Sequence, residues 1–410
     1  MIGPASSLSG MTPPTDSPLP TTDAASPVRE RGEPSTGAPG VGRLIGLDLA
    51  RGLAVFGMYA VHVGPAPGQG GVIGFLMELA QGRSSALFAV LAGFAVALIT
   101  GRRTPKTGPA GRQAVAKVII RAVILMALGT ALTLTGTPVV PILAFYGLFF
   151  LLVLPLYRLG TKPLALIAVG WALVGPQLLY ALKPVFGGRV FLSYGQADGP
   201  VSLFFTGGYP ALTWVPFVIA GMAVARCDLA ATAVRIRLAL TGVALAVTGY
   251  GGSWLALRLV PGAAEAVRKA EEGPGMSSVS PDSIGIFGDT PAGMLASAPH
   301  SEATLSIVAA TGVAVLVITA CLAAMDAFPR LRRLARPVIA VGSMSLTAYV
   351  YHIVAIWLLD TEEATVQPLY VLLGFIASVT VLATVWSRFF RRGPLEWLMG
   401  RATRIARRIR

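Results

Sequence analysis

The sequence predicts an all-α fold, a polytopic bundle of transmembrane helices. Three observations carry this prediction: 54% of the 410 residues are hydrophobic, only 13% are charged, and the mean hydropathy is +0.70. A soluble protein carries about 25% charged residues, and a chain this apolar cannot supply the polar surface that a soluble fold of its size exposes. The composition therefore excludes an ordinary soluble protein and a disordered one.

The two ends of the chain are expected to differ from its centre. Residues 1–42 are rich in Pro, Gly, Ser and Thr and contain no apolar run. Such a segment cannot bury enough surface to offset its chain entropy, so we expect a disordered cytoplasmic tail. Residues 391–410 are expected to form a basic cytoplasmic tail, and residues 43–390 the membrane domain.

The membrane domain alternates apolar runs of helix length with short polar joints. A helix needs ~20 mostly apolar residues to cross the hydrocarbon layer, and only a helix satisfies its backbone hydrogen bonds within such a run. A half-inserted piece at residues 72–81 would raise the number of membrane segments from ten to eleven. The ten predicted spans are 44–64, 83–101, 116–136, 139–157, 163–182, 209–225, 236–259, 303–325, 337–359 and 369–389.

The positive charges indicate how these spans are oriented. If the joints are assigned alternately to two sides, one side holds 26 of the 33 Lys and Arg residues and the other holds six. Lys and Arg gather in cytoplasmic loops, so we expect both termini in the cytoplasm and a multi-pass protein of the plasma (inner) membrane. The formal net charge of +14 then comes mostly from cytoplasmic Lys and Arg residues that anchor the protein at the lipids of the inner leaflet. It does not imply a nucleic-acid partner.

The first span carries a stripe of polar side chains. Asp48 and Arg51 lie one turn apart and can form an ion pair. Arg51 and His62 are eleven residues apart, which leaves about 20° between their directions and a rise of about 16 Å. Together with Tyr59 they form one face, which we expect to line the bundle interior from its inner to its outer end. A structural ion pair and an interfacial histidine are the alternative interpretation.

All three histidines fall in the predicted outer half of the membrane domain. His62 ends the first span, His300 lies in the long outer loop 258–302, and His352 shares a helix face with Tyr349. A histidine with an ordinary pKa near 6.5 is a ready proton carrier. No two histidines have the spacing of metal ligands, so no metal site is predicted.

Two groups of arginines also need a reason. Arg83 opens the second span on the outer side, against the charge rule, so we expect an anionic partner or ligand; contact with lipid phosphate is the alternative. The basic joint 102–121 contains Arg102, Arg103 and Arg121. Its charges set the topology, and they could also hold the phosphates of a cytoplasmic cofactor.

Several motifs resemble one family when they are taken in their order along the chain. The stretch RLIGLDLARGLAVFGMYAVHVG, followed by GRSSALFAVLAGFAVAL, resembles the start of the transmembrane acyltransferase superfamily, in particular its YeiB-like members and the domain of heparan-alpha-glucosaminide N-acetyltransferase. The pair Arg51 and His62 is similar to the Arg–His signature of OafA-type acyltransferases. The further matching stretches are GYPALTWVPFVIAGMAVAR at 208–226, APHSEAT at 298–304, GSMSLTAYVYHI at 342–353 and RRGPLEWLM at 391–399.

The resemblance implies an enzyme that moves an acyl group, here acetyl, from cytoplasmic acyl-CoA to a glycan or another envelope-linked acceptor outside. It implies that Arg51 holds the thioester arm and that His62 is a general base or a transient acyl carrier. The heparan enzyme has its active histidine in the loop after this span, but residues 65–82 contain none; the role of His62 comes from the OafA-type signature. The predicted site residues are His62, Arg51 and His352 for catalysis, Arg51, Arg102, Arg103 and Arg121 for acyl-CoA, and Arg83, His300, Ser301 and Tyr349 for the acceptor.

Two other function classes remain open at this point. A transporter or exporter of a small or lipid-linked molecule would also carry intramembrane charges, typically on broken helices at mid-depth. A scaffold protein without catalytic activity would explain the apolar composition, but it would leave Arg51, His62 and Arg83 without a role.

Overall fold

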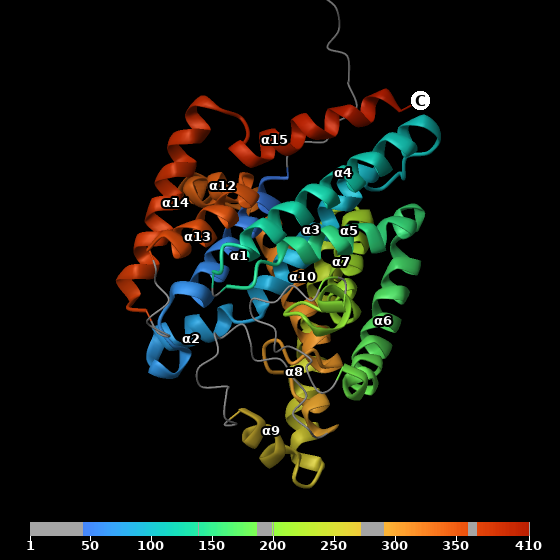
Figure 1. Cartoon of the computed structure of the whole chain (residues 1–410), viewed down its shortest axis with the longest axis vertical. Helices are drawn as coiled ribbons and strands as arrows, with labels where there is room; N and C mark the ends of the chain where they lie inside the picture. The colour runs from blue at the N-terminus through green and yellow to red at the C-terminus, as the bar shows by residue number, and fades with distance from the viewer. Residues whose placement is uncertain are drawn as a thin grey trace, which may run out of the picture. The chain divides into compact units, whose positions relative to one another are not determined.

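The structure, a computed structural model, describes residues 44–137, 139–186, 199, 201–271, 291–359 and 367–409. The predicted tail 1–42 lies outside these residues. The described residues form helices and contain no β-strand (Figure 1). The helices are α1 Ile45–Val63, α2 Gly71–Ala80, α3 Arg83–Thr100, α4 Gly108–Thr133, α5 Leu143–Val153, α6 Thr161–Leu182, α7 Ala211–Arg226, α8 Thr232–Leu259, α9 Ala263–Glu271, α10 Thr304–Ala327, α11 Pro329–Leu334, α12 Arg336–Ser343, α13 Ser345–Leu359, α14 Leu369–Phe389 and α15 Pro394–Ala402.

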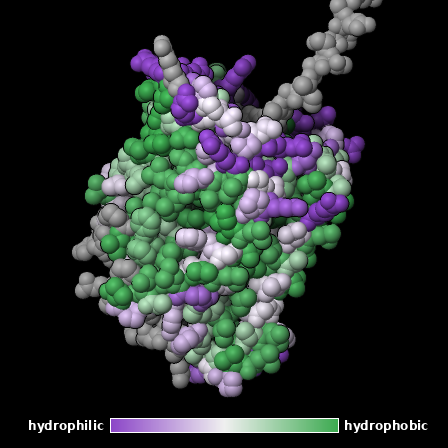
Figure 2. Space-filling view, turned by 90° about the vertical axis from the view of Figure 1, so that its right-hand side faces the viewer, coloured by the Kyte–Doolittle hydropathy of each residue, from purple (hydrophilic) through white to green (hydrophobic). Residues whose placement is uncertain are grey.

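Several of these helices are built to lie in a membrane. Among the described residues, six helical segments are long and apolar enough to cross it, or seven if the bent pair α12–α13 counts as one span. The face in Figure 2 is covered by hydrophobic side chains, and hydrophilic ones gather at its upper end. Large apolar side chains such as Leu166 and Val381 are more than half exposed, which suits lipid and not water. The chain is an integral membrane protein; ten crossings and cytoplasmic termini stay predictions.

Each predicted span overlaps a helix, but several helix ends differ from the prediction and one span is bent. Helix α4 begins at Gly108 and not at residue 116, because the charges of its first turns do not prevent a helix from extending beyond an apolar layer. The predicted span 337–359 is bent by 86° between α12 and α13. The bend falls at Gly342, Ser343 and Ser345, a Gly–Ser stretch of the kind at which helices kink, but the stretch is too short to divide the surrounding apolar run into two spans.

Glycines allow the central helices to approach closely. A Cβ at Gly93 of α3 would lie 1.8 Å from the carbonyl oxygen of Val218 in α7, and one at Gly221 would lie 1.8 Å from that of Val90. A Cβ at Gly342 of α12 would lie 1.7 Å from the carbonyl oxygen of Asp48 in α1. Small residues at such contacts are typical of membrane helix pairs, and the last one fixes α12 against the polar stripe of α1.

Candidate functional site

Two of the three histidines meet in the bundle. His62, near the end of α1, and His352, in α13, are joined by a 2.8 Å hydrogen bond between Nδ1 of His62 and Nε2 of His352. Their rings are nearly parallel, at 9°, with centroids 5.1 Å apart. The sequence placed both residues in the outer half, and the structure brings them into direct contact. We call them the histidine pair.

Two tyrosines form the walls around His352. The hydroxyl of Tyr59 donates a 2.7 Å hydrogen bond to the carbonyl oxygen of Ala348, and its ring lies 4.6 Å from that of His352. The ring of Tyr349 meets His352 edge-on at 4.9 Å, while its hydroxyl accepts the backbone N–H of Ile142. His352 is fully buried and His62 is partly exposed, so the pair has one fixed and one accessible member.

This arrangement allows the histidine pair to bind and release a proton. One ring nitrogen of the contact must donate and the other must accept. If Nδ1 of His62 donates to His352, His62 presents Nε2 as a proton acceptor. When His62 gains a proton there, the bond to His352 becomes charge-assisted and stronger. His352 would then orient His62 and stabilise its charged form, as the third member of a catalytic triad does for its histidine.

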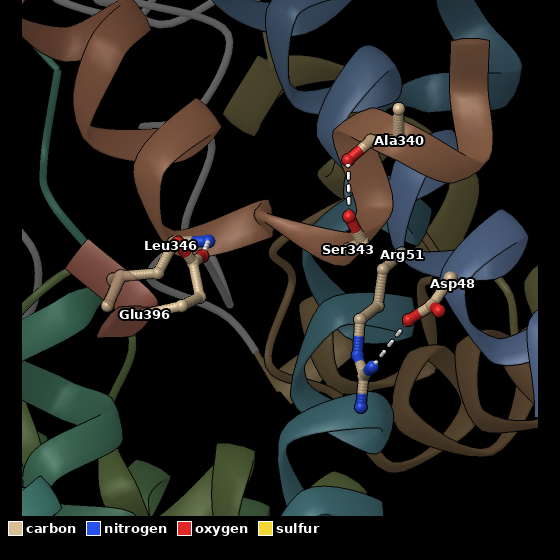
Figure 3. A network of polar contacts seen from close by, with 6 residues as sticks. All are labelled: Asp48, Arg51, Ala340, Ser343, Leu346 and Glu396. Atoms are coloured by element: carbon tan, nitrogen blue, oxygen red, sulfur yellow. Dashed lines mark hydrogen bonds and ion pairs between the residues drawn. The ribbon is translucent and has the colours of Figure 1, made fainter. Parts of the chain in front are cut away.

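The predicted ion pair on α1 is confirmed. Nη1 of Arg51 lies 3.1 Å from Oδ1 of Asp48, with 22% of the Arg51 side chain exposed and 8% of that of Asp48 (Figure 3). The pair sits where α1 packs against α12, since a Cβ at Gly52 would meet the carbonyl oxygen of Val338. These contacts support the interpretation of Asp48 and Arg51 as a structural ion pair. The side chain of Arg51 nevertheless remains partly exposed.

The bend between α12 and α13 is fixed by an acid from the C-terminal segment. Glu396 of α15 accepts a 2.8 Å hydrogen bond from the backbone N–H of Leu346 (Figure 3). It also accepts a 2.6 Å hydrogen bond from the hydroxyl of Thr347. A carboxylate at a helix N-terminus satisfies donors that lack intrahelical partners and complements the helix dipole. At the other side of the bend, the hydroxyl of Ser343 donates to the carbonyl oxygen of Ala340.

The four arginines predicted to bind acyl-CoA separate into two groups. Arg121 of α4 lies close enough to Arg51 and Arg392 to be repelled by their positive charges. We call these three residues the arginine cluster. Arg103 instead forms an ion pair with Asp228 at 3.1 Å. Its neighbour Arg102 is influenced by both Arg103 and Asp228.

Arg226, at the end of α7 and two residues before Asp228, is a buried cation. It is 6% exposed and donates to the carbonyl oxygen of Tyr157. Within the described part of the chain, its Nε and Nη1 atoms have no hydrogen-bond partner. A buried cation without a counter-charge is costly, so this position is suited to an anion.

Of the four residues predicted to bind the acceptor, Tyr349 lies beside His352, whereas two, Arg83 and His300, line a small pocket elsewhere. Arg83, His300 and the side chains of Trp214 and Tyr250 contribute to its walls, and its cavity volume is ≈ 30 Å³. Neither member of the histidine pair lines it. We call it the outer pocket, because the predicted topology places its loops outside. Next to it, the buried hydroxyl of Ser301 donates to the carbonyl oxygen of Ala296.

The outer pocket also contains an acid that the sequence analysis did not single out. Glu302 is 4% exposed and accepts a 2.9 Å hydrogen bond from Nε1 of Trp214. Burial, opposed by hydrogen bonds from Thr213 and Trp214, raises the pKa of Glu302 to about 8. The backbone of both His300 and Glu302 is left-handed, with φ of 53° and 54°, a strain that is concentrated at functional sites.

Two models of known families match parts of the chain. The model of the catalytic domain of heparan-alpha-glucosaminide N-acetyltransferase matches residues 43–249, half of the chain. The chain belongs to this family. A second family model, described as a protein of unknown function, matches residues 292–406, and no curated protein matches the chain. The family supports a membrane acetyltransferase in general terms, as the resemblance predicted.

The two family models meet in the site. The first contains α1 with His62, and the second contains α13 with His352. The hydrogen bond of the histidine pair therefore joins the two matched regions. Within the described residues, no group of three or more His, Cys, Asp or Glu side chains is arranged to hold a metal ion.

Three residues of these sites were missed by sequence reasoning. Arg226 and Arg392 were counted only as topological charges in basic joints, where nothing marks one cation as buried. Glu302 had a usable signal, since it is an acid directly before an apolar span and beside His300 and Ser301.

Proposed function

We propose that this protein transfers an acetyl group from cytoplasmic acetyl-CoA to a glycan or another envelope-linked acceptor on the outer side of the plasma membrane. The observation that carries the proposal is the histidine pair. It joins the two matched regions, lies among buried tyrosines and includes one accessible ring. Ionisable side chains inside a membrane are costly in free energy, and they usually mark a functional site.

His62 is the group that meets the acceptor. As the acceptor hydroxyl or amine attacks the thioester carbonyl, Nε2 of His62 takes its proton, the C–S bond breaks, and the leaving sulfur of CoA receives a proton. His352 holds the His62 ring and stabilises its positive charge. In the alternative route, His62 itself attacks the thioester and carries the acetyl group to the acceptor.

The arginines on the predicted cytoplasmic side are suited to the donor. Acyl-CoA carries several phosphates, and guanidinium groups bind phosphate oxygens bidentately. The arginine cluster offers three cations near the inner end of the polar stripe. Arg226, Arg102 and Arg103 form a second cationic region, which Asp228 only partly neutralises.

The test uses purified full-length protein in detergent with acetyl-labelled acetyl-CoA. We expect the wild type to release CoA or to transfer label, and His62→Ala to reduce this by about 10²-fold to 10⁴-fold, the usual contribution of a general base. Leu53→Ala is the matched control, because Leu53 lies on the same helix and is 44% exposed. Label that stays on the wild-type protein without an acceptor would identify the acyl-carrier route. Equal activity of His62→Ala and Leu53→Ala would refute the proposal.

A transporter is the second candidate, and one observation favours it. The 86° break between α12 and α13 resembles the discontinuous helices from which transporters build their substrate sites. The two functions separate in vesicles. A transporter would move substrate without consuming acetyl-CoA, whereas the proposed enzyme releases one CoA for each acetyl group transferred.

A further inference from the structure

The outer pocket is held in place by two loops that lock together. Gly82, directly before α3, has a φ of +63°, and a Cβ there would lie 3.0 Å from the Cβ of Pro299. Arg83, the first residue of α3, follows Gly82, and His300 follows Pro299, so this contact holds both residues at the same pocket. Trp214 and Tyr250 complete its walls from α7 and α8.

Arg83 reaches this pocket with neutral partners. Its Nε donates a 2.6 Å hydrogen bond to the hydroxyl of Tyr250, and its Nη1 donates a 2.7 Å hydrogen bond to the carbonyl oxygen of Glu78. The guanidinium also lies 5.1 Å from the centre of the Tyr250 ring. No described carboxylate forms an ion pair with Arg83. A guanidinium has five N–H groups, so these two bonds do not exhaust its donors.

Glu302 lines the same pocket as Arg83, but it forms its hydrogen bonds with residues of α7 and does not pair with Arg83. Its carboxyl is fixed by Trp214 and Thr213 of α7. Burial raises its pKa to about 8, so at neutral pH the group is mostly protonated and uncharged. The other titratable groups around it are Arg83, Tyr250 and His300 in the pocket wall, together with Tyr209, whose ring lies 5.6 Å from that of His300.

We propose that the outer pocket binds a small oxyanion, a phosphate or carboxylate carried by the acceptor, with Arg83 as its cationic partner. The inference rests on the proposed function and narrows its acceptor to an acidic molecule. A neutral Glu302 leaves the positive charge of Arg83 available and can donate a hydrogen bond to the anion. An ionised Glu302 would repel it. The cavity volume of ≈ 30 Å³ limits the recognised group to the size of a few atoms.

The first test measures sulfate binding to purified, lipid-free protein by calorimetry, because sulfate is an oxyanion that does not titrate between about pH 6 and 9. We expect Arg83→Gln to weaken binding by at least about tenfold, in keeping with a charge-assisted contact. Arg258→Gln is the matched control. Like Arg83, Arg258 lies on the predicted outer side, but it belongs to α8 and stands 4.1 Å over the ring of Trp254, outside the pocket. Equal effects of the two variants would overturn the proposal.

The second test uses pH. Sulfate affinity of the wild type should fall as the pH rises through about 8, and Glu302→Gln should remove this fall. A fall near pH 8 that persists in Glu302→Gln would refute the role of Glu302.

A lipid phosphate is the competing source of the same chemistry. Anionic phosphatidylglycerol and neutral diacylglycerol, added in detergent, separate the two sources. If phosphatidylglycerol competes with sulfate and diacylglycerol does not, the pocket binds a lipid headgroup, which contradicts the acceptor assignment. If neither lipid competes, the acceptor assignment is supported. None of these measurements requires acetyl transfer. A failure of the proposed function therefore shows as absent CoA release, and a failure of this inference as absent sulfate binding.

Discussion

The histidine pair and the outer pocket are two ways of placing polar groups in an apolar bundle. The first is built on regular helices, and its members hold each other by a 2.8 Å hydrogen bond. The second is built where two loops meet the helices α3, α7, α8 and α10, with strained backbone at His300 and Glu302 and a glycine contact between the two loops. Helices fix a reacting group firmly, and loops shape a surface to one ligand. The difference suits a division between chemistry at the pair and recognition at the pocket.

The largest expected effect tests the helical side of this comparison. His352→Phe keeps an aromatic ring between Tyr59 and Tyr349 but removes the bond to His62. We expect CoA release to fall by about 100-fold, with a changed pH profile, since His62 loses the group that orients it and stabilises its charge. His352→Gln should recover part of the activity, because an amide can still form a hydrogen bond. Kinetics across pH measure both.

The control for this prediction is Tyr351→Phe, a neighbouring substitution on α13. Tyr351 packs at the edge of the core, outside the histidine pair. If His352→Phe and Tyr351→Phe had equal activity and equal pH profiles, His352 would be only a packing residue.

The second prediction concerns the close contact between α12 and α1 at Gly342 and Asp48. In Gly342→Ala the new methyl group would lie 1.7 Å from the carbonyl oxygen of Asp48, so α12 must move away from α1. We expect a loss of about 1–3 kcal/mol of stability, typical of overpacking, seen as a lower Tm in detergent. Gly374→Ala is the control, because nothing lies within 4 Å of the added carbon. A Tm equal to that of the control would show that α12 and α1 separate without cost.

Sequence reasoning was successful for the helices and limited for the sites. The apolar runs predicted helices at all ten positions because the 3.6-residue period and the length requirement of a membrane are local properties. The stripe of Asp48, Arg51 and His62 follows from the same period, and its ion pair is confirmed. The side of the membrane on which each end lies rests on charge alone and stays a prediction.

Contacts between distant segments could not be predicted in the same way. His62 and His352 are 290 residues apart, and no local pattern states that they touch. The 86° bend before α13 lies at a short Gly–Ser stretch, which permits a kink but does not set its angle. Glu302 is marked in the sequence by its place before an apolar span, but its contact with Trp214 and its charge state are not, because burial decides whether an acid near a membrane is charged.

The third prediction addresses the loop side through pH. The folded chain keeps the proton of Glu302 up to about pH 8, and the unfolded chain loses it near 4.5. Between these values the unfolded state binds fewer protons, so stability falls as the pH rises, by at most about 1.4 kcal/mol per pH unit. Thermal unfolding from about pH 5 to 9 should show this fall in the wild type and a shallower one in Glu302→Gln. Parallel curves would mean that Glu302 is charged in the folded protein.

The smallest expected effect tests whether the outer pocket depends on its loop contact. Gly82→Ala places a side chain at a φ of +63° and 3.0 Å from Pro299, which we expect to cost about 1 kcal/mol and to shift Arg83. Sulfate affinity should therefore fall severalfold with only a slightly lower Tm. Gly251→Ala in α8 is the control, since its Cβ would enter open space. Unchanged sulfate affinity in Gly82→Ala would show that Arg83 is positioned by Tyr250 and the carbonyl of Glu78 alone, and that the strained loop is not required for recognition.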